Sequence, residues 1–186
     1  MGVIFDLDQT IINSSIAYQA RRNRDWQLVY SLIPKMKPYT RVVELIKAMV
    51  NQGIEVAIVT SSPRPYCTKV LNYLGITNVI TVCYHDTQKH KPDPEPMLLA
   101  ISKMKNQEGK KIIAIGDEEN DIIAANRANI LSVLAYWSKP NVYNTISVQP
   151  NVFCKDEESL IKYFVSQGIN IGQSALREKL SYISII

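Results

Sequence analysis

The sequence has no long hydrophobic run. None of its apolar stretches approaches the roughly eighteen residues that a membrane-spanning helix needs. The N-terminus has no basic stretch followed by an apolar segment and a small-residue cleavage site, which argues against a secretion signal. Cysteine is scarce and odd in number: Cys67, Cys83 and Cys154 show neither metal-binding nor redox spacing, which is typical of free thiols in a reducing compartment. These absences predict a soluble, cytoplasmic protein with no membrane partner.

Two common phosphate-binding signatures are also missing. The chain contains neither G-x-x-x-x-G-K-[ST] nor G-x-G-x-x-G, which argues against the nucleotide-binding folds that use them. The formal net charge of +4 mildly favours anionic ligands but is well below that of dedicated nucleic-acid-binding proteins. There is no internal repeat, low-complexity tract or linker. Residues 1–186 are therefore expected to form a single domain.

Short apolar runs alternate with longer amphipathic stretches. The runs are rich in Val and Ile and are apolar on both faces, as strands of a helix-covered parallel sheet are. This alternation predicts an α/β fold: a doubly wound, Rossmann-like parallel sheet flanked by helices. The predicted strands are Val3–Phe5, Val56–Thr60, Val79–Val82, Ile112–Ile115 and Ile130–Leu134.

The stretches between these runs have the apolar spacing of helices. Ser62 and Asp93 each precede a proline, which is typical of an N-cap with proline at the first helical position. The predicted helices cover 42–50 (with Gly53 as a stop), Ser62 to Leu74, Asp93 to Met104, Asp117 toward Ala128, and Asp156 to Gln167.

Two segments fall outside the alternation. Residues 13–38 predict a small cap insertion of one or two short helices between the first strand and the next long helix. Residues 169–186 predict a C-terminal extension that packs either on the body of the protein or on a second subunit.

Polar residues follow several predicted strands, at the edge where ligands bind in folds of this type. Taken singly, each has a plain structural reading as a loop acid, a capping residue or a surface lysine. Together at one edge, they indicate a phosphate site. The groups are Asp6 and Asp8, Thr60 and Ser61, Lys91, and Asp117 with Asp121.

Their chemistry is complementary. Carboxylates on neighbouring strands, from Asp6 and Asp117, can hold Mg²⁺ through hard oxygens. Asp8 can protonate a leaving oxygen and later activate water. A cradle for phosphate is expected from Thr60, the Ser61 backbone N–H and the start of the following helix. Lys91 adds positive charge where negative charge develops.

The same residues occur in the order of four motifs of the haloacid dehalogenase superfamily. The chain resembles phosphatases of that superfamily, with phosphoglycolate-phosphatase-like motifs and a much reduced cap, over roughly residues 2–165. Gln9 stands where glycine is common. The motifs are Asp6-Leu7-Asp8-Gln9-Thr10, Thr60-Ser61, Lys91-Pro92 and Gly116-Asp117-Glu118-Glu119-Asn120-Asp121.

The resemblance implies a role for each residue. Asp6 is the nucleophile and Asp8 the general acid and base. Thr60, Ser61 and Lys91 bind phosphate, with Lys91 also stabilising the intermediate. The implied Mg²⁺ ligands are Asp6, the Asp8 carbonyl and Asp117, with Thr10 supporting them. Asp121 either supports these ligands in the same way or holds Lys91.

An acid at position 8 favours phosphomonoester hydrolysis, because an alcohol leaving group needs a proton. A phosphotransferase or phosphomutase shares all four motifs and differs mainly in excluding water. A non-catalytic receiver domain is the alternative of a different class. Its phosphorylated aspartate follows the third strand, whereas that strand leads here into Cys83-Tyr84-His85.

A small cap excludes water poorly and offers few specificity contacts. Either a second subunit completes the site, as in a homo-oligomer, or the phosphorylated substrate is bulky and covers itself. The cap is basic and aromatic, which suits a phosphorylated or nucleotide-like ligand but also fits a solvated helix face. The residues concerned are Tyr18, Arg21, Arg22, Arg24 and Trp26.

Overall fold

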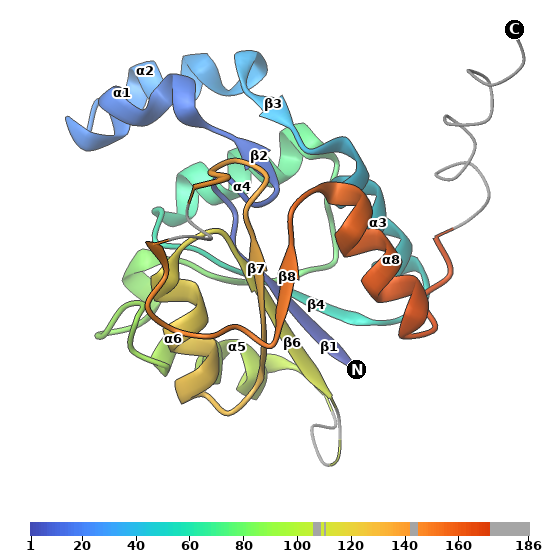
Figure 1. The fold of residues 1–186 in the computed structure, drawn as a ribbon. Helices are drawn as coiled ribbons and strands as arrows, with labels where there is room; N and C mark the ends of the chain where they lie inside the picture. The colour runs from blue at the N-terminus through green and yellow to red at the C-terminus, as the bar shows by residue number, and fades with distance from the viewer. Residues whose placement is uncertain (106–108, 110, 142–144, 172–186) are drawn as a thin grey trace, which may run out of the picture.

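A computed structural model describes residues 1–105, 109, 111–141 and 145–171 (Figure 1). Most of the predicted C-terminal extension, from residue 172 onward, therefore lies outside the described residues. The main sheet has six parallel strands in the order β5-β4-β1-β6-β7-β8. This order confirms the predicted doubly wound fold. The strands are β1 (Gly2–Phe5), β4 (Glu55–Val59), β5 (Ile80–Val82), β6 (Ile112–Gly116), β7 (Leu131–Ala135) and β8 (Val152–Cys154).

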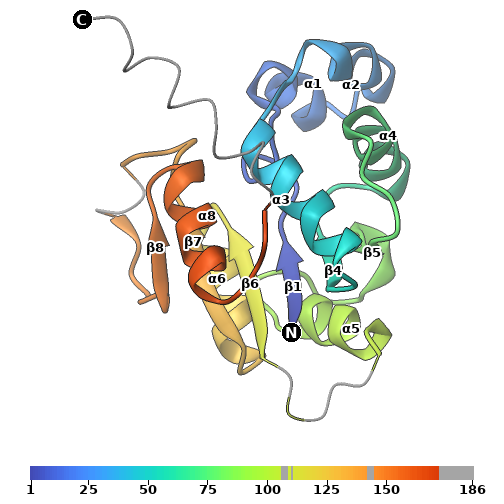
Figure 2. The ribbon, with the colours of Figure 1, turned by 90° about the vertical axis from the view of Figure 1, so that its right-hand side faces the viewer.

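Helices cover both faces of this sheet. Side chains that alternate along a strand therefore belong to two separate hydrophobic cores, one on each face. In β1, Val3 and Phe5 join the core under α3, α4 and α8, whereas Ile4 joins the core under α5 and α6. Figure 2 shows α3 and α8 lying together on their face, away from α5. These helices are α3 (Thr40–Asn51), α4 (Arg64–Leu74), α5 (Glu95–Lys103), α6 (Glu119–Arg127) and α8 (Glu157–Ser166).

Residues 13–38, called the insertion below, begin and end in a short antiparallel ribbon formed by β2 (Ile12–Asn13) and β3 (Lys37–Pro38). Figure 1 shows the insertion above the carboxyl ends of the main strands. Its buried face consists of small and aliphatic residues such as Ala20 and Val29. Between β2 and β3 the elements are η1 (Ser15–Ala17), α1 (Tyr18–Arg22), α2 (Trp26–Leu32) and η2 (Ile33–Lys35).

The register of β1 positions the site. Phe5 pairs with Ile58 of β4 on one side and with Ile115 of β6 on the other. The three chains therefore leave the sheet at the same edge, where Asp6 follows β1 and Asp117 follows β6. Among the described residues, the structure contains no helix of the length and apolarity that crossing a membrane requires.

Candidate active site

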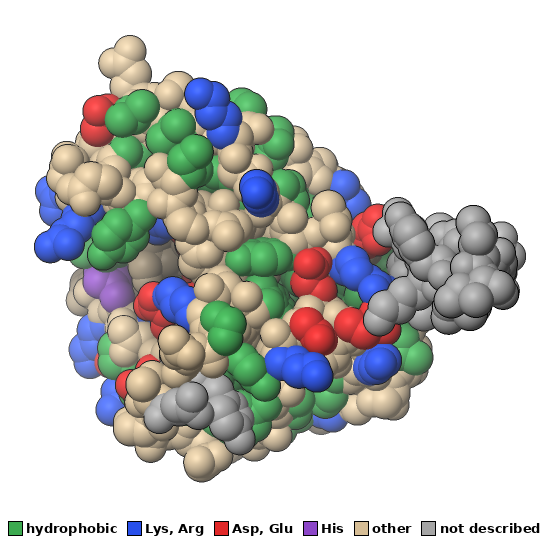
Figure 3. Space-filling view, turned by 45° about the horizontal axis from the view of Figure 1, so that its top comes forward, with side chains coloured by type: hydrophobic (Ala, Val, Ile, Leu, Met, Phe, Trp, Pro, Cys, Tyr) green, Lys and Arg blue, Asp and Glu red, His purple; other side chains and the backbone are tan. Residues whose placement is uncertain are grey.

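A cavity of about 220 Å³ opens at this carboxyl edge. Figure 3 shows the hollow on this face, with acidic side chains in red and a basic one in blue inside it. The structure brings most of the predicted site residues into its wall. Two predicted residues, Thr10 and Thr60, are instead buried in the body of the protein. The predicted residues in the wall are Asp6, Asp8, Ser61, Lys91, Asp117 and Asp121.

Buried carboxylates form the floor of this cavity. Asp6, Asp117 and Asp121 each place one oxygen within 4.8 Å of the others. The Lys91 ammonium lies among them, 2.7 Å from Asp6 Oδ1 and 2.5 Å from Asp121 Oδ1. Burial alone would lower the pKa of Lys91, but Asp121 and Asp6 outweigh it and raise the pKa above its usual range. Lys91 is therefore a fixed positive charge.

The carboxyl groups of the floor are short of positive charge. Burial, followed by the repulsion from Asp121, raises the pKa of Asp117 to about 7. Burial also raises the pKa of Asp6 well above its ordinary value, although Lys91 opposes this effect. Asp117 Oδ2 faces the Lys139 ammonium at 2.9 Å, and its Oδ1 accepts a hydrogen bond from Thr10 Oγ1 at 3.5 Å. A bound cation would relieve the remaining repulsion.

Gly116 allows the close approach of β6 and α6 that this floor requires. A Cβ at this position would lie 2.3 Å from the Cβ of Asp121, so no larger residue fits without displacing that aspartate. Asp121 is itself held by the backbone N–H of Glu118, which donates to its Oδ2 at 3.1 Å. The glycine of the motif thus has a steric reason, because it leaves room for the partner of Lys91.

Asp8 has a different environment from Asp6. Ser62 Oγ donates to its Oδ2 at 2.8 Å, and the buried Tyr66 hydroxyl donates to its Oδ1 at 2.7 Å. Arg21, from α1 of the insertion, lies 2.8 Å from the same Oδ1. Both oxygens of Asp8 are thus held by donors, two from the region of α4 and one from the insertion.

The prediction that Ser62 is the N-cap of a helix with Pro63 in its first turn is wrong. Pro63 has extended backbone (φ −69°, ψ 151°) and is itself the N-cap, so α4 begins one residue later. The Ser62 hydroxyl is used at the site instead, where it donates to Asp8 and accepts from Arg21 at 3.0 Å. The Ser62 N–H donates to Thr60 Oγ1 at 3.1 Å, which fixes the turn after β4.

The N-cap of α5 is also displaced by one residue from the prediction. Pro94 is the N-cap, and α5 begins at Glu95. Asp93 still accepts a hydrogen bond from the Glu95 N–H at 3.0 Å, so its side chain satisfies a free donor at the helix start.

The comparisons with known proteins agree with this geometry. The sequence profile described as haloacid dehalogenase-like hydrolase matches residues 19–135. The chain belongs to this family. The matched range begins after Asp6 and Asp8, so the roles proposed for these two residues depend on the motif and on the geometry described above.

Curated relatives of this chain have phosphate-related names. A putative pyrophosphatase PpaX of Caldanaerobacter subterraneus is 30% identical over 130 residues, which are 67% of this chain and 59% of the relative. A phosphoglycolate phosphatase of Salmonella typhi is 32% identical over 97 residues, 51% of this chain and 38% of the relative. The matched parts thus span less than two thirds of the length of these relatives.

Solved structures share the fold of this family member. A putative phosphoglycolate phosphatase from Lactobacillus plantarum superposes with a TM-score of 0.70 at 20% identity, covering 87% of this chain and 97% of that one. A hydrolase from Pseudomonas syringae gives a TM-score of 0.75 at 20% identity, covering 89% and 98%. At this level of identity, the likeness shows the fold alone.

Sequence reasoning missed two residues of the candidate site, Tyr66 and Lys139. Tyr66 occupies an apolar position of α4 and is fully buried, so its spacing is that of a core residue. Lys139 follows β7 by four residues and pairs with Glu118 as well as Asp117. Its place after a strand was a usable signal, although the aromatic residues beside it are more conspicuous.

Trp137 and His90 were also considered as substrate contacts, but both lie outside the cavity. Trp137 packs edge-on against Tyr39, with ring centroids 5.8 Å apart. His90, which precedes Lys91, stacks on Tyr84 with centroids 3.9 Å apart. Neither Trp137 nor His90 lines the catalytic cavity. Both side chains pack against other rings.

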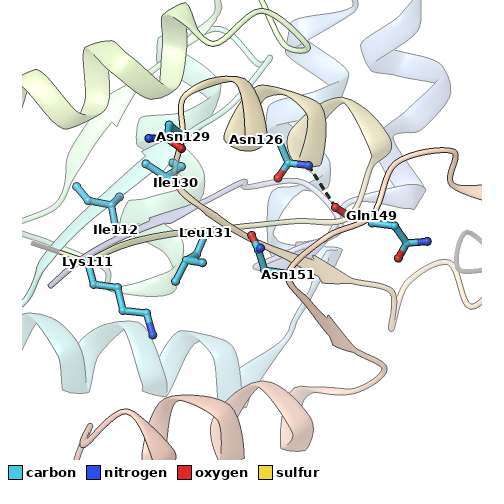
Figure 4. Close-up of a pocket in the computed structure, with 8 residues that line it drawn as sticks. All are labelled: Lys111, Ile112, Asn126, Asn129, Ile130, Leu131, Gln149 and Asn151. Carbon is cyan, nitrogen blue, oxygen red and sulfur yellow. Dashed lines mark hydrogen bonds between the residues drawn. The ribbon is translucent and has the colours of Figure 1, made fainter.

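Figure 4 shows a cavity of about 460 Å³ at the opposite edge of the sheet, beside the starts of β6 and β7. Two of its amide side chains bond to neighbours: Asn126 donates to the Gln149 carbonyl at 3.2 Å, and Asn151 accepts from the Ser132 N–H at 2.8 Å. Its lining residues include no acid. The candidate active site is therefore the cavity at the carboxyl edge.

Proposed function

We propose that this chain is a Mg²⁺-dependent phosphomonoester hydrolase that passes through an aspartyl-phosphate on Asp6. The observation that carries the proposal is the pair of environments around Asp6 and Asp8. Asp6 is buried beside Lys91 and two further carboxylates, whereas Asp8, two residues later, is held by Ser62, Tyr66 and Arg21. The phosphatase and pyrophosphatase names of the relatives support phosphoryl chemistry.

The floor of the cavity fits Mg²⁺. This ion prefers carboxylate and carbonyl oxygens, and here carboxylate oxygens lie within 4.8 Å of one another. Burial, followed by the repulsion from Asp121, raises the pKa of Asp117 to about 7, and a cation bound beside these carboxylates would offset both effects. Asp6, Asp117 and the Asp8 main-chain carbonyl would hold the ion, with Thr10 and Asp121 supporting them. Bound Mg²⁺ supplies the positive charge that lets an anionic nucleophile approach a phosphate.

The reaction then uses the residues in two steps. A carboxylate oxygen of Asp6 attacks phosphorus, and the bond from phosphorus to the leaving oxygen breaks while Asp8 gives that oxygen a proton. Water next attacks the phosphorus of the aspartyl-phosphate and gives its proton to Asp8. The bond between phosphorus and the Asp6 oxygen breaks, and this step releases inorganic phosphate and restores the Asp6 carboxylate. Lys91 stabilises the charge on the phosphoryl oxygens, which the Ser61 N–H also binds. Thr60 supports this cradle by accepting from the Ser62 N–H, which fixes the turn that carries Ser61.

The small size of the insertion favours hydrolysis over transfer to another alcohol. A phosphomutase must exclude water, and the insertion offers only the five residues of α1 and the seven of α2 as helical cover. The substrate or a second copy of the chain would complete that cover. Light scattering of the protein in solution distinguishes these two cases.

The test is release of inorganic phosphate by the purified protein after chelation and return of Mg²⁺. The substrate panel holds pyrophosphate and phosphoglycolate, because relatives carry those names, together with an aryl phosphate and nucleoside monophosphates. Many turnovers on at least one ester, lost in Asp6→Asn, are the expected result. Phosphorylation of the protein without turnover would instead indicate a receiver-like module.

A further inference from the structure

We propose that Arg22 and Arg24 form a subsite for a second anionic group on the substrate. The inference rests on the proposed phosphatase function, because it assumes that the first phosphate occupies the catalytic cavity. It concerns a second cavity, of about 430 Å³, whose wall includes Arg22, Arg24, Trp26, Tyr84 and His85.

The two cavities adjoin. Arg21 and Ser61 belong to the walls of both. Ser61 is the residue whose backbone N–H is proposed to bind the transferred phosphate. A substrate that places one phosphate at Asp6 therefore has a continuous path from Ser61 toward the basic cavity. In Figure 3, basic side chains in blue and a histidine in purple lie at one side of the hollow.

The charges of the second cavity are uncompensated. Arg21 is committed to Asp8, Ser14 and Ser62. By contrast, no acidic side chain in the described part of the chain pairs with Arg22 or Arg24, and both are exposed. The acid between them and α2, Asp25, accepts from the Leu28 N–H at 3.0 Å and so caps that helix. Two free guanidinium groups beside one cavity are a suitable site for phosphate or carboxylate.

The backbone at Arg24 ends α1 and turns the chain toward α2. Its φ is 58°, the left-handed conformation common just after a helix, and the Arg24 N–H donates to the Arg21 carbonyl at 3.0 Å. The next N–H, of Asp25, donates to the Ala20 carbonyl at 2.9 Å and completes this helix end. The turn places Arg24 beside Arg22 at the wall of the second cavity.

Aromatic side chains line the second cavity, and their rings contact other rings. The Trp26 ring lies 6.2 Å from that of the buried Tyr66, and Tyr84 stacks on His90. Rings held this way reduce the access of water and strengthen charge-assisted hydrogen bonds nearby. They also offer a surface for a nucleobase. The unpaired arginines favour the anion, and the experiment below separates these two ligands.

The experiment uses linear alkanediol bisphosphates from two to six carbons, each compared with the monophosphate of the same diol. A bisphosphate has two equivalent phosphates that can react, so its kcat/KM should be about twice that of the monophosphate even without a second subsite. A charge-assisted bond raises this to about tenfold or more for at least one chain length. Most of the gain is expected in KM, because the second anion is bound equally in the ground and transition states.

Arg22→Gln with Arg24→Gln should reduce the advantage to about twofold. The matched control is Lys35→Gln with Lys37→Gln, which removes the same charge from exposed sites of the insertion outside the cavity and should keep the advantage. The proposal is overturned if no bisphosphate exceeds twofold, or if the advantage survives the arginine changes. It is also overturned if both double variants lose it equally, or if only nucleoside monophosphates are preferred.

A binding measurement separates this proposal from the phosphatase function. Isothermal titration of Asp6→Asn with the favoured bisphosphate and its monophosphate needs no turnover. Tighter binding of the bisphosphate, lost with the arginine changes, supports the subsite even if the wild type releases no phosphate. Equal binding of the two ligands contradicts the subsite even if the wild type is an active phosphatase.

Discussion

The charged side chains on the floor of the catalytic cavity are buried and form ion pairs, whereas those of the insertion above it are mostly exposed. On the floor, Lys91 is bound by Asp6 and Asp121, and all three side chains are buried. In the insertion, Arg22 and Arg24 are exposed and unpaired within the described residues. The floor comes from segments far apart in sequence, whereas the insertion is one local segment. Arg21 joins the insertion to the cavity through its contact with Asp8, and Tyr18 of the insertion also lines the cavity.

This difference indicates a division of labour. The buried charges of the floor, with Lys91 held between Asp6 and Asp121, have fixed positions, as bond-making chemistry requires. The exposed charges of the insertion can be exchanged at little cost in stability, because surface substitutions usually change it by less than about 0.5 kcal/mol. We therefore expect substitutions on the floor to change kcat and substitutions in the insertion to change KM.

The largest effect is expected from Asp6→Asn. The amide is nearly isosteric but cannot attack phosphorus, so phosphate release should fall by on the order of 10³-fold or more. The same exchange in the insertion, Asp25→Asn, keeps a good capping residue and should leave the rate within about twofold. Unfolding curves of both variants verify the fold. If folded Asp6→Asn keeps a tenth or more of wild-type turnover, Asp6 is not the nucleophile, and the contrast between the floor and the insertion fails.

Metal removal should expose the charge surplus of the floor. The pKa of Asp117 in the folded protein, about 7, exceeds its ordinary value of 3.8. Its contribution to the stability of the metal-free protein is therefore fully present below about pH 4 and lost as the pH rises through about 7. Mg²⁺, which binds the deprotonated form, should raise Tm more at pH 8 than at pH 5.

Thermal unfolding with chelator or with Mg²⁺ at the two pH values measures this effect. In Asp117→Asn, the difference between the two pH values should shrink. Equal stabilisation by Mg²⁺ at both pH values, in the wild type, would argue against a metal site on the floor.

Tyr66→Phe tests the support of Asp8 from the protein body. Loss of a hydrogen bond to a charged group, about 1.5–3 kcal/mol, should lower kcat/KM for an alkyl phosphate by about tenfold or more. An aryl phosphate with an acidic leaving phenol should lose less, because it needs less help from a general acid. Tyr73→Phe, in the same helix, removes an exposed hydroxyl that donates to the Pro34 carbonyl and serves as the control. Equal losses on both substrates would mean that Tyr66 does not act through Asp8.

The smallest effect is expected from Gln9→Gly. Gln9 has a φ of 65°, where glycine is free of Cβ strain. The relief of strain and the added freedom of the unfolded chain oppose each other, so the free energy of unfolding should change by less than about 1 kcal/mol. Turnover should stay within about twofold. A tenfold loss would show that the Gln9 amide, which lines the cavity, contacts the substrate.

The meeting of Asp6 and Asp117 was predictable because each directly follows a strand that the sequence marks clearly. Lys91, in the loop before α5, and Asp121, in the first turn of α6, were predicted from the order of the motifs. Parallel strands meet at one edge, so Asp6 and Asp117 had to converge once β1 and β6 were recognised. The partners of Asp8 were not predictable in the same way. Tyr66 occupies a core position of α4, and its contact with Asp8 depends on how that helix packs.

The start of α4 and the position of β8 could not be predicted from the sequence pattern. The extended conformation of Pro63 moved the start of α4 and freed the Ser62 hydroxyl for Asp8. Strand β8 was missed because Val152–Cys154 is too short to show a period and leaves Phe153 partly exposed at the sheet edge. In both cases tertiary context determined the structure of a segment whose sequence alone is ambiguous.

The most direct test is to locate the phosphoryl group during turnover. Protein mixed with an aryl phosphate and Mg²⁺ is quenched in acid within the first turnover, digested and measured by mass spectrometry. We predict one phosphoryl group on Asp6, formed and lost at rates compatible with kcat and absent in Asp6→Asn. A phosphoryl group on Asp8 or Asp117, or sustained turnover with no phosphorylated peptide, would contradict the assignment of Asp6 as the nucleophile.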